Sequence, residues 1–128
     1  MSEALIVAAV RTPIGKAPRG SLRHTRPDAL AAFAIRALLE RVPALNPTQI
    51  EDVIFGCATP EGESGMNIAR VAALRAGLPT TIPGVTVNRF CASELEQVGS
   101  AAHRVWSVPS SGAKIDASDP TTIGYNLR

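Results

Sequence analysis

Three short apolar runs, rich in valine and isoleucine, alternate along the chain with segments whose apolar residues recur at helical spacing. The runs lie at residues 4–10, 53–58 and 84–90, and each has the length and composition of a strand in a largely covered sheet. Strands that alternate with helices usually pair in parallel through right-handed crossovers. The order β-α-β-α-β-α therefore predicts an α/β layered domain with a mostly parallel sheet.

The three helical segments carry start and stop signals. Pro27 opens the first, and we expect this helix to end near Arg41. Residues 67–76 form the second, with Gly77 placed as its C-cap. Residues 92–106 form the third. These helices would cover the faces of the sheet and complete the layers.

The last part of the chain lacks such a pattern. From residue 107 onward, proline, serine, glycine and aspartate are scattered among few apolar residues, so we expect residues 107–128 to be an irregular or disordered tail. Residues 1–106 then form the domain. With only three expected strands the sheet is incomplete, and its last strand would be an unprotected edge that something else should cover.

Composition and charge exclude several classes of protein. Thirteen basic and eleven acidic residues give a net charge of +2, which indicates no nucleic-acid partner. No apolar run approaches the ~20 residues of a membrane helix, so we expect a cytoplasmic protein without a membrane partner. The two cysteines indicate free thiols and no metal site. The local basic excess at residues 11–26 fits a solvated loop or an anionic ligand.

One cysteine occupies a position suited to chemistry. Cys91 follows the last expected strand and precedes the last expected helix, at the strand end where ligands bind in open α/β sheets. The unpaired N–H groups and the positive end of the helix dipole would favour a thiolate there. The alternative is a small buried apolar residue, as most free cysteines are, and position alone does not separate the two.

Four separated segments of the chain share a family resemblance. They are AAVRTPIGK at residues 8–16, RPDALAA at 26–32, VIFGCATPEGESGMNIAR at 53–70 and VNRFCAS at 87–93. In this order they resemble thiolases of the acetyl-CoA acetyltransferase and 3-ketoacyl-CoA thiolase kind, in which the last segment surrounds the acyl-accepting cysteine. The resemblance covers roughly residues 4–106, and the tail resembles nothing in that family.

The resemblance implies a thiolase-like layered fold and an acyltransferase. Cys91 would take an acyl group as a thioester, which either CoA or the carbanion of a second acyl-CoA would then attack. Coenzyme A would be a substrate, and no cofactor would be bound permanently. Thiolases form dimers or tetramers, so the resemblance also implies a homo-oligomer.

Part of the family's machinery is absent from this sequence. Thiolases also use a histidine and a second cysteine from the C-terminal half of their chain, and no segment here resembles either. We therefore expect this chain to be a fragment that is inactive alone. One alternative is a non-catalytic thiolase remnant that acts as an interaction module. Another, weaker one is a Cys–His hydrolase that pairs Cys91 with His24, for which no orienting acid is recognisable.

Four other residues bear on this interpretation. His103 lies twelve residues along the expected helix from Cys91, ~18 Å away and too far for proton transfer, and His24 is expected in a solvated loop. Cys57 falls within an expected strand, which indicates a structural role in the core. Glu94 stands where thiolases typically have glycine, and its carboxylate would oppose a thiolate at Cys91, although it also suits the first turn of a helix.

Overall fold

The computed structural model describes residues 4–107 and 122–125 of the chain. Helices and strands alternate along most of this part, as predicted. In chain order the elements are α1 (Pro27–Arg41), a 3₁₀ turn (Pro47–Gln49), β1 (Asp52–Gly56), a 3₁₀ turn (Gly62–Ser64), α2 (Ile68–Ala76), β2 (Gly84–Val87), a 3₁₀ turn (Phe90–Ala92), α3 (Ser93–Ser107) and β3 (Thr122–Tyr125).

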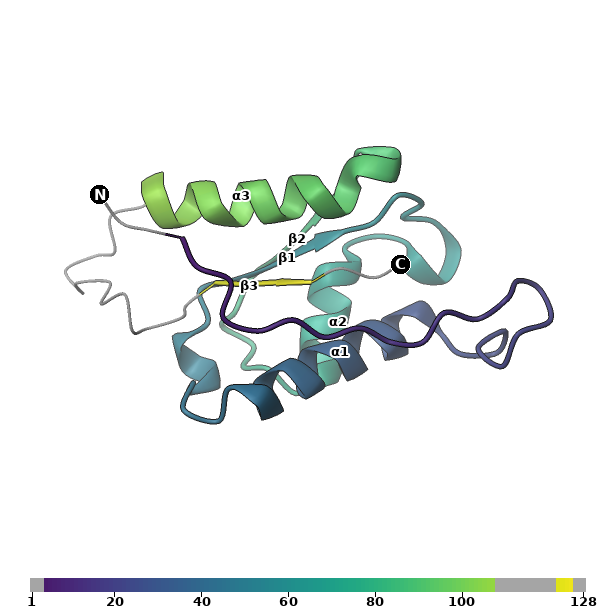
Figure 1. Ribbon diagram of the computed structural model, residues 1–128, viewed down its shortest axis with the longest axis horizontal. Helices are drawn as coiled ribbons and strands as arrows, with labels where there is room; N and C mark the ends of the chain where they lie inside the picture. The colour runs from purple at the N-terminus through teal and green to yellow at the C-terminus, as the bar shows by residue number, and fades with distance from the viewer. Residues whose placement is uncertain (1–3, 108–121, 126–128) are drawn as a thin grey trace.

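The strands of the described residues form one parallel sheet in the order β2-β1-β3. β1 is central, with Val53 opposite Gly84 of β2 and Asp52 opposite Thr122 of β3. Helices α1 and α2 cover one face of the sheet and α3 covers the other (Figure 1). The parallel pairing confirms the predicted class, and it places the carboxyl ends of β1 and β2 at the same end of the sheet.

The main hydrophobic core lies between the sheet and the layer formed by α1 and α2. Because helices cover both faces of β1, the strand is apolar on both sides: Val53 and Phe55 belong to this core, and Ile54, on the opposite face, is also buried. Several of the helical core residues are alanine, which lets the helices pack closely. The core residues of the two helices are Ala31, Ile35, Leu38, Ile68, Ala69, Ala72 and Ala73.

The predicted helices are confirmed. α1 ends at Arg41, as expected. α2 begins after Asn67, whose side chain accepts a hydrogen bond from the N–H of Arg70 at 3.2 Å, and it ends at Gly77, whose φ of 89° is the left-handed conformation that favours glycine. α3 begins at Ser93.

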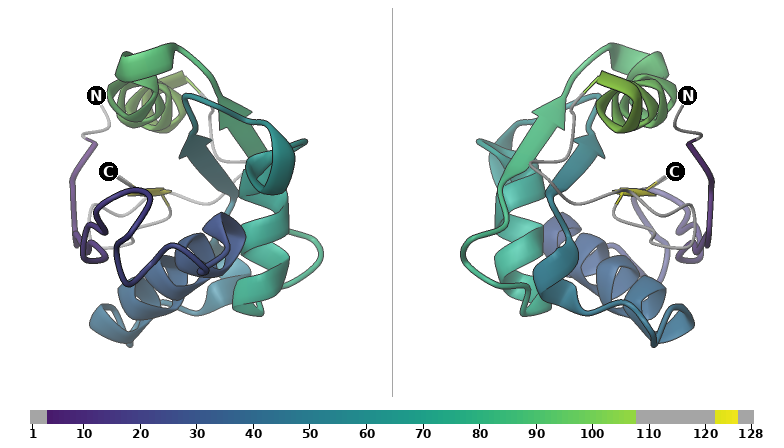
Figure 2. Two further views of the ribbon diagram at one scale, coloured as in Figure 1. Left: turned by 90° about the vertical axis from the view of Figure 1, so that its right-hand side faces the viewer. Right: turned by 90° about the vertical axis from the view of Figure 1, so that its left-hand side faces the viewer.

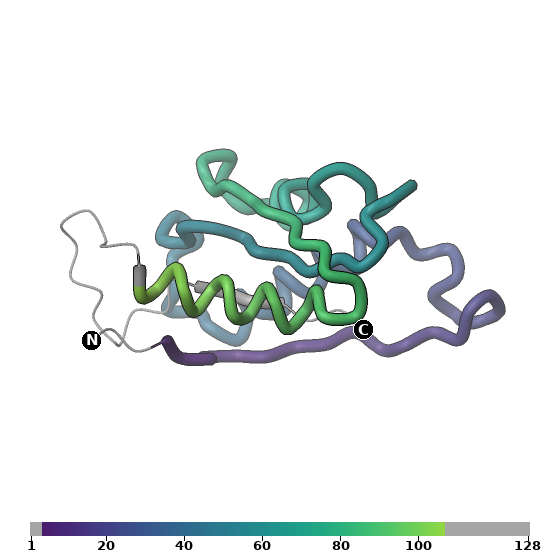
Figure 3. Tube along the Cα trace, turned by 90° about the horizontal axis from the view of Figure 1, so that it is seen from above, coloured from purple at the N-terminus to yellow at the C-terminus, as the bar shows by residue number. Residues whose placement is uncertain are grey.

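The prediction of a first strand at residues 4–10 is wrong. In the structure these residues belong to no strand, and Leu5, Ile6 and Val7 are exposed. They run along one side of the fold (Figure 3), beyond β3 on the side away from β1 (Figure 2). The physical reason is that β1 has two edges, of which β2 takes one and β3 the other, so the N-terminal segment has no β1 edge to pair with.

The prediction for the tail is wrong at the five residues that the structure describes there, the first of which, Ser107, is the last residue of α3. Thr122–Tyr125 form β3, although residues 107–128 were expected to be irregular. Pairing with β1 supplies hydrogen-bond partners to a short segment whose own sequence signal is weak. The expectation for residues 108–121 and 126–128 lies outside the described residues. The edge predicted to be unprotected belongs to β2, which has no neighbour on its outer side among the described strands.

Candidate active site at Cys91

Cys91 lies in an exposed turn between β2 and α3. The strand ends at Val87, the 3₁₀ turn Phe90–Ala92 holds the cysteine, and α3 begins at Ser93. The strand is shorter than predicted, because the chain turns at Asn88 instead of continuing to Phe90. Since Cys91 is exposed, it is not the small buried apolar residue of the alternative interpretation. Its thiol is accessible to a reagent or substrate.

Backbone and side-chain hydrogen bonds fix the shape of this turn. Phe90 has a φ of 48°, a left-handed conformation that a bulky residue adopts only where its surroundings impose it. The Asn88 side-chain oxygen accepts a hydrogen bond from the N–H of Phe90 at 3.0 Å. The Ser93 hydroxyl accepts from the N–H of Arg89 at 2.8 Å and donates to the carbonyl of Phe90 at 2.6 Å. Cys91 therefore lies in a turn that is held by hydrogen bonds of the Asn88 and Ser93 side chains and is strained at Phe90.

Gly56, the last residue of β1, lets the start of α3 approach the sheet. A Cβ at this position would lie 2.6 Å from the carbonyl oxygen of Ser93 and 2.8 Å from the nitrogen of Glu94, both backbone atoms. The N–H of Gly56 also donates to the side-chain oxygen of Gln97, which is fully buried. These contacts hold the first turns of α3, and with them the turn that carries Cys91.

Sequence reasoning missed both residues that anchor this helix. A glycine within an apolar strand is a known sign of a close backbone approach, and Gly56 could have been recognised in that way. Gln97 had no such signal, because a glutamine in a helix is ordinarily solvated.

The charges around Cys91 come mostly from α3. The cysteine lies two residues ahead of the helix, near its positive end. Arg89 forms an ion pair with Glu96. Glu94 is half-buried and forms no ion pair within the described part of the chain. The opposing effect of Glu94 on a Cys91 thiolate thus stays a prediction.

Neither histidine is placed as a base for Cys91. His24 is exposed, and its Nε2 accepts a hydrogen bond from the guanidinium of the adjacent Arg23 at 2.9 Å. His103 projects from α3 and contacts Trp106 edge to face, with ring centroids 5.4 Å apart. No hydrogen bond between His24 and Cys91 exists among the described residues, so the geometry gives the Cys–His hydrolase hypothesis no support.

Cys57 was predicted to lie within a strand. In the structure it lies just beyond the end of β1. It is half-buried and packs against the core, and its N–H donates to the carbonyl of Val87 at 2.9 Å. The expected structural role agrees with this packing. Among the described residues, no group of three or more histidine, cysteine or acidic side chains is placed to hold a metal ion.

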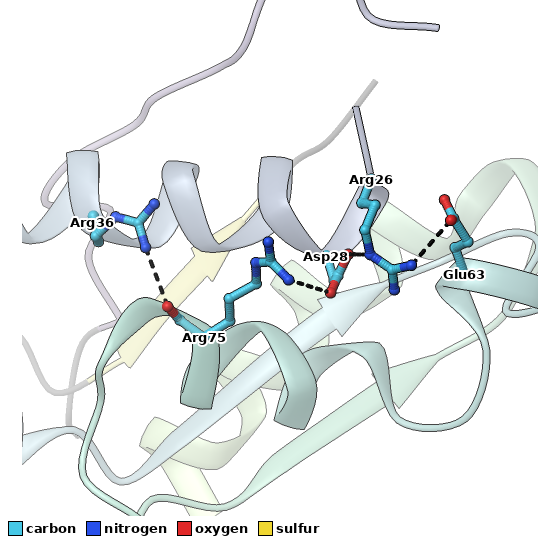
Figure 4. Close-up of polar contacts among 5 residues, drawn as sticks. All are labelled: Arg26, Asp28, Arg36, Glu63 and Arg75. Carbon is cyan, nitrogen blue, oxygen red and sulfur yellow. Dashed lines mark hydrogen bonds and ion pairs between the residues drawn. The ribbon is translucent and has the colours of Figure 1, made fainter. Parts of the chain in front are cut away.

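A second polar cluster joins two of the segments that carried the family resemblance (Figure 4). The buried carboxylate of Asp28 is bonded to Arg26 at 3.0 Å and to Arg75 at 3.1 Å. Arg26 also pairs with Glu63 at 3.0 Å. Burial raises the pKa of Asp28, but the hydrogen bond and charge of Arg26 and the charge of Arg75 outweigh it, so the pKa lies below its ordinary value of 3.8. This cluster ties α1 to α2 and to the loop before it.

A cavity of about 520 Å³ is lined by the loop after Arg11 and by the start of α1. Lys16 and Arg23 from the basic stretch are among its lining residues, together with Leu22 and Leu30, and Cys91 is not. The anionic ligand considered for this stretch stays a prediction. No helix among the described residues is both long enough and apolar enough to cross a membrane.

Comparison with known proteins decides the family of this site. The family model described as thiolase, N-terminal domain, matches residues 4–111. The chain belongs to the thiolase family. The layered α/β portion described above is accordingly an incomplete thiolase-like fold, as the sequence resemblance implied. The matched range contains Cys91 and the whole of the turn around it.

Three relatives show how much of a thiolase is present. The chain is 48% identical over 105 residues to a 3-ketoacyl-CoA thiolase of Bacillus subtilis, covering 82% of this chain and 27% of that one. It is 49% identical over 107 residues to a 3-ketoacyl-CoA thiolase of Colwellia psychrerythraea, covering 84% and 28%. It is 47% identical over 105 residues to a beta-ketoadipyl-CoA thiolase of Acinetobacter baylyi, covering 82% and 26%. The chain thus spans about a quarter of the length of these thiolases.

Proposed function

We propose that Cys91 accepts the acyl group in a thiolase-type acyltransferase reaction. The observation that carries this proposal is the exposed thiol in a turn fixed by Ser93 and Asn88, directly before α3. Membership of a family of acyltransferases supports the reaction class. A fixed turn keeps the sulfur in one place at the start of α3, where it can attack the carbonyl of an acyl-CoA.

The first half-reaction is an exchange of thioesters. The Cys91 thiolate attacks the carbonyl carbon of an acyl-CoA, a new carbon–sulfur bond forms, and the bond to the CoA sulfur breaks. The proton lost by Cys91 ends on the released CoA thiol, so that atoms and charges balance. Coenzyme A is a substrate in this scheme, and no permanently bound cofactor takes part.

The second half-reaction requires a base and a second thiol, and among the residues that the structure describes no hydrogen bond joins such a group to Cys91. Thiolases use a further histidine and cysteine, and neither histidine of this chain lies where it could serve. We therefore propose that this chain alone takes up an acyl group but does not complete the transfer to CoA or to a second acyl-CoA. A cytoplasmic location and a homo-oligomeric state complete the proposal.

The uptake of an acyl group is tested by intact mass spectrometry. The purified chain is incubated with acetyl-CoA, and the expected product is one acetyl adduct that maps to Cys91. The Cys57→Ser variant is the matched control and should still form the adduct, whereas Cys91→Ser should not. A folded chain that forms no adduct, or forms it equally well without Cys91, contradicts the proposal.

A second candidate function is a non-catalytic interaction module. The half-buried Glu94, which replaces the glycine typical of thiolases, and the exposed apolar side chains of α3 favour it. The same mass measurement separates the two candidates, because the interaction module requires no adduct and the acyltransferase requires one.

A further inference from the structure

The loop of residues 12–26 and the start of α1 enclose a cavity of about 520 Å³. This volume lies within the range of small-molecule sites, which is about 300–1,000 Å³. The loop extends beyond the end of the sheet at which α3 begins (Figures 1 and 3). Cys91 does not line the cavity, so a molecule bound there is separate from the proposed acyl transfer.

The wall of the cavity is a loop that folds back on itself. The N–H of Gly20 donates to the carbonyl of Lys16, and the N–H of Arg23 donates to the carbonyl of Gly20 at 3.1 Å. A Cβ at Gly20 would lie 2.7 Å from the carbonyl oxygen of Lys16, which excludes a larger residue without backbone movement. Across the loop, a Cβ at Gly15 would lie 3.1 Å from the Cβ of Leu22. These close approaches shape the cavity before any ligand binds.

Two cations at the cavity have no acidic partner. Lys16 and Arg23 line it, and neither forms an ion pair within the part of the chain that the structure describes. Both are exposed, and their long side chains can turn toward an anion at the mouth of the cavity. The sequence contains no aspartate or glutamate between residues 4 and 27. The potential around the cavity is therefore positive.

A buried hydroxyl lies at the same cavity. Thr12 is among the lining residues and is only 8% exposed. Its hydroxyl forms no hydrogen bond with residues 4–107 or 122–125, and it is open to the cavity and not enclosed in the core. Buried polar side chains nearly always have a hydrogen-bond partner. The Thr12 hydroxyl therefore indicates that a polar group of a ligand occupies this end of the cavity.

The rest of the lining favours hydrocarbon and a carboxylate. Leu22 and Leu30 provide apolar surface. Pro13, Pro18 and Pro27 also line the cavity, and proline has no backbone N–H to donate. Phosphate sites usually rely on several backbone N–H groups that point at the anion. A carboxylate needs fewer donors, so this cavity suits a carboxylate on a hydrocarbon body better than a phosphate.

We propose that the cavity binds a small carboxylate with a hydrocarbon body. The carboxylate accepts hydrogen bonds from the Lys16 ammonium, the Arg23 guanidinium and the Thr12 hydroxyl, and charged donors of this kind make the stronger bonds. The hydrocarbon packs against Leu22 and Leu30. The ligand is a free acid and not a thioester, so its binding does not depend on the chemistry of Cys91.

Isothermal titration calorimetry with sodium octanoate tests this proposal on the purified chain. Octanoate should bind at one site. Octanamide has the same hydrocarbon without the charge and should bind about tenfold more weakly or worse. Inorganic phosphate has charge without hydrocarbon and should also bind about tenfold more weakly or worse. Cys91→Ser should bind octanoate as the wild type does, which separates this site from the acyl transfer.

Variants of the loop locate the site. Lys16→Gln combined with Arg23→Gln should weaken octanoate binding by about tenfold. The matched control is Arg11→Gln combined with Arg19→Gln, which removes the same charge from exposed residues that do not line the cavity and should change the affinity by less than about twofold. Thr12→Val keeps the shape of the side chain and should weaken binding severalfold. Urea unfolding checks that each variant is folded.

Several results would overturn the proposal. A folded chain that does not bind octanoate does so, and so does a chain that binds octanamide equally well. Equal weakening by the two double variants would mean that only net charge attracts the ligand, and no weakening by either would place the ligand elsewhere, such as on the exposed apolar residues of α3. Phosphate that binds as tightly as octanoate would make the cavity an anion site with no preference for hydrocarbon.

Discussion

Replacing Gly56 with alanine is expected to disturb the junction that positions Cys91. The added methyl would lie 2.6 Å from the carbonyl oxygen of Ser93, whereas ordinary contact begins at 3.4 Å. The start of α3 would thus have to move by about 0.8 Å, the difference between these two distances. The atoms in the way belong to the backbone, so a side-chain rotation cannot relieve the contact.

The expected loss in the free energy of unfolding of Gly56→Ala has two contributions. Overpacking of this kind costs about 1–3 kcal/mol. The same movement stretches the hydrogen bond from Gly56 to the buried oxygen of Gln97, whose weakening costs about 1 kcal/mol. We therefore expect Gly56→Ala to lower the free energy of unfolding by about 2–4 kcal/mol. The rate of Cys91 alkylation should change with it, because the turn before α3 moves.

Urea unfolding at low protein concentration measures the stability, and intact mass spectrometry measures the alkylation. The control is Gly99→Ala, which adds the same methyl group in open space. We expect this variant to be unchanged or up to about 1 kcal/mol more stable, because alanine favours a helix over glycine. A loss of less than about 0.5 kcal/mol for Gly56→Ala, which is the range of an ordinary surface substitution, would refute this account of the contact with Ser93.

Three further predictions concern charge and the turn. Asp28→Asn should lower the free energy of unfolding by about 1–3 kcal/mol at neutral pH. In urea unfolding, the difference from wild type should shrink as the pH falls below 3.8 toward the depressed pKa of the folded state, because wild-type Asp28 then also becomes neutral. Glu94→Gly should raise the rate of Cys91 alkylation at neutral pH, because a nearby carboxylate opposes the thiolate. Ser93→Ala should lower stability by about 1–3 kcal/mol in the same unfolding assay, since its buried hydroxyl bridges Arg89 and Phe90.

Each of these has a control or a result that would contradict it. For Asp28, the control is Glu63→Gln, which removes only an exposed ion pair and should lower the free energy of unfolding by less than about 1 kcal/mol. A loss of stability in Asp28→Asn that does not change with pH would show that charge is not the cause. Equal alkylation rates with and without Glu94 across pH would discard the electrostatic effect. A Ser93→Ala chain as stable as wild type would mean that the turn does not depend on the hydroxyl.

The helices of the first hundred residues could be predicted because their signals are local. Apolar spacing, the position of Pro27 and the left-handed Gly77 specify where α1 and α2 begin and end, whatever the rest of the chain does. The place of Cys91 between a strand and a helix was predictable for the same reason. The left-handed conformation of Phe90 and the hydrogen bond that the Ser93 hydroxyl donates to its carbonyl could not be predicted. Both depend on the path of the chain through the turn.

The alternation of helices and strands over residues 27–106, the bounds of the helices and the family resemblance were determined by the sequence alone. Tertiary structure decided which segment occupies the second edge of β1: residues 4–10 have the stronger strand composition, yet Thr122–Tyr125 take that place. It also decided which face of α3 meets the sheet, with Gln97 inward and Leu95 outward. Local patterns give a segment its preference for strand or helix, but an edge or a face can be filled only once, so competition among distant segments settles which residues fill it.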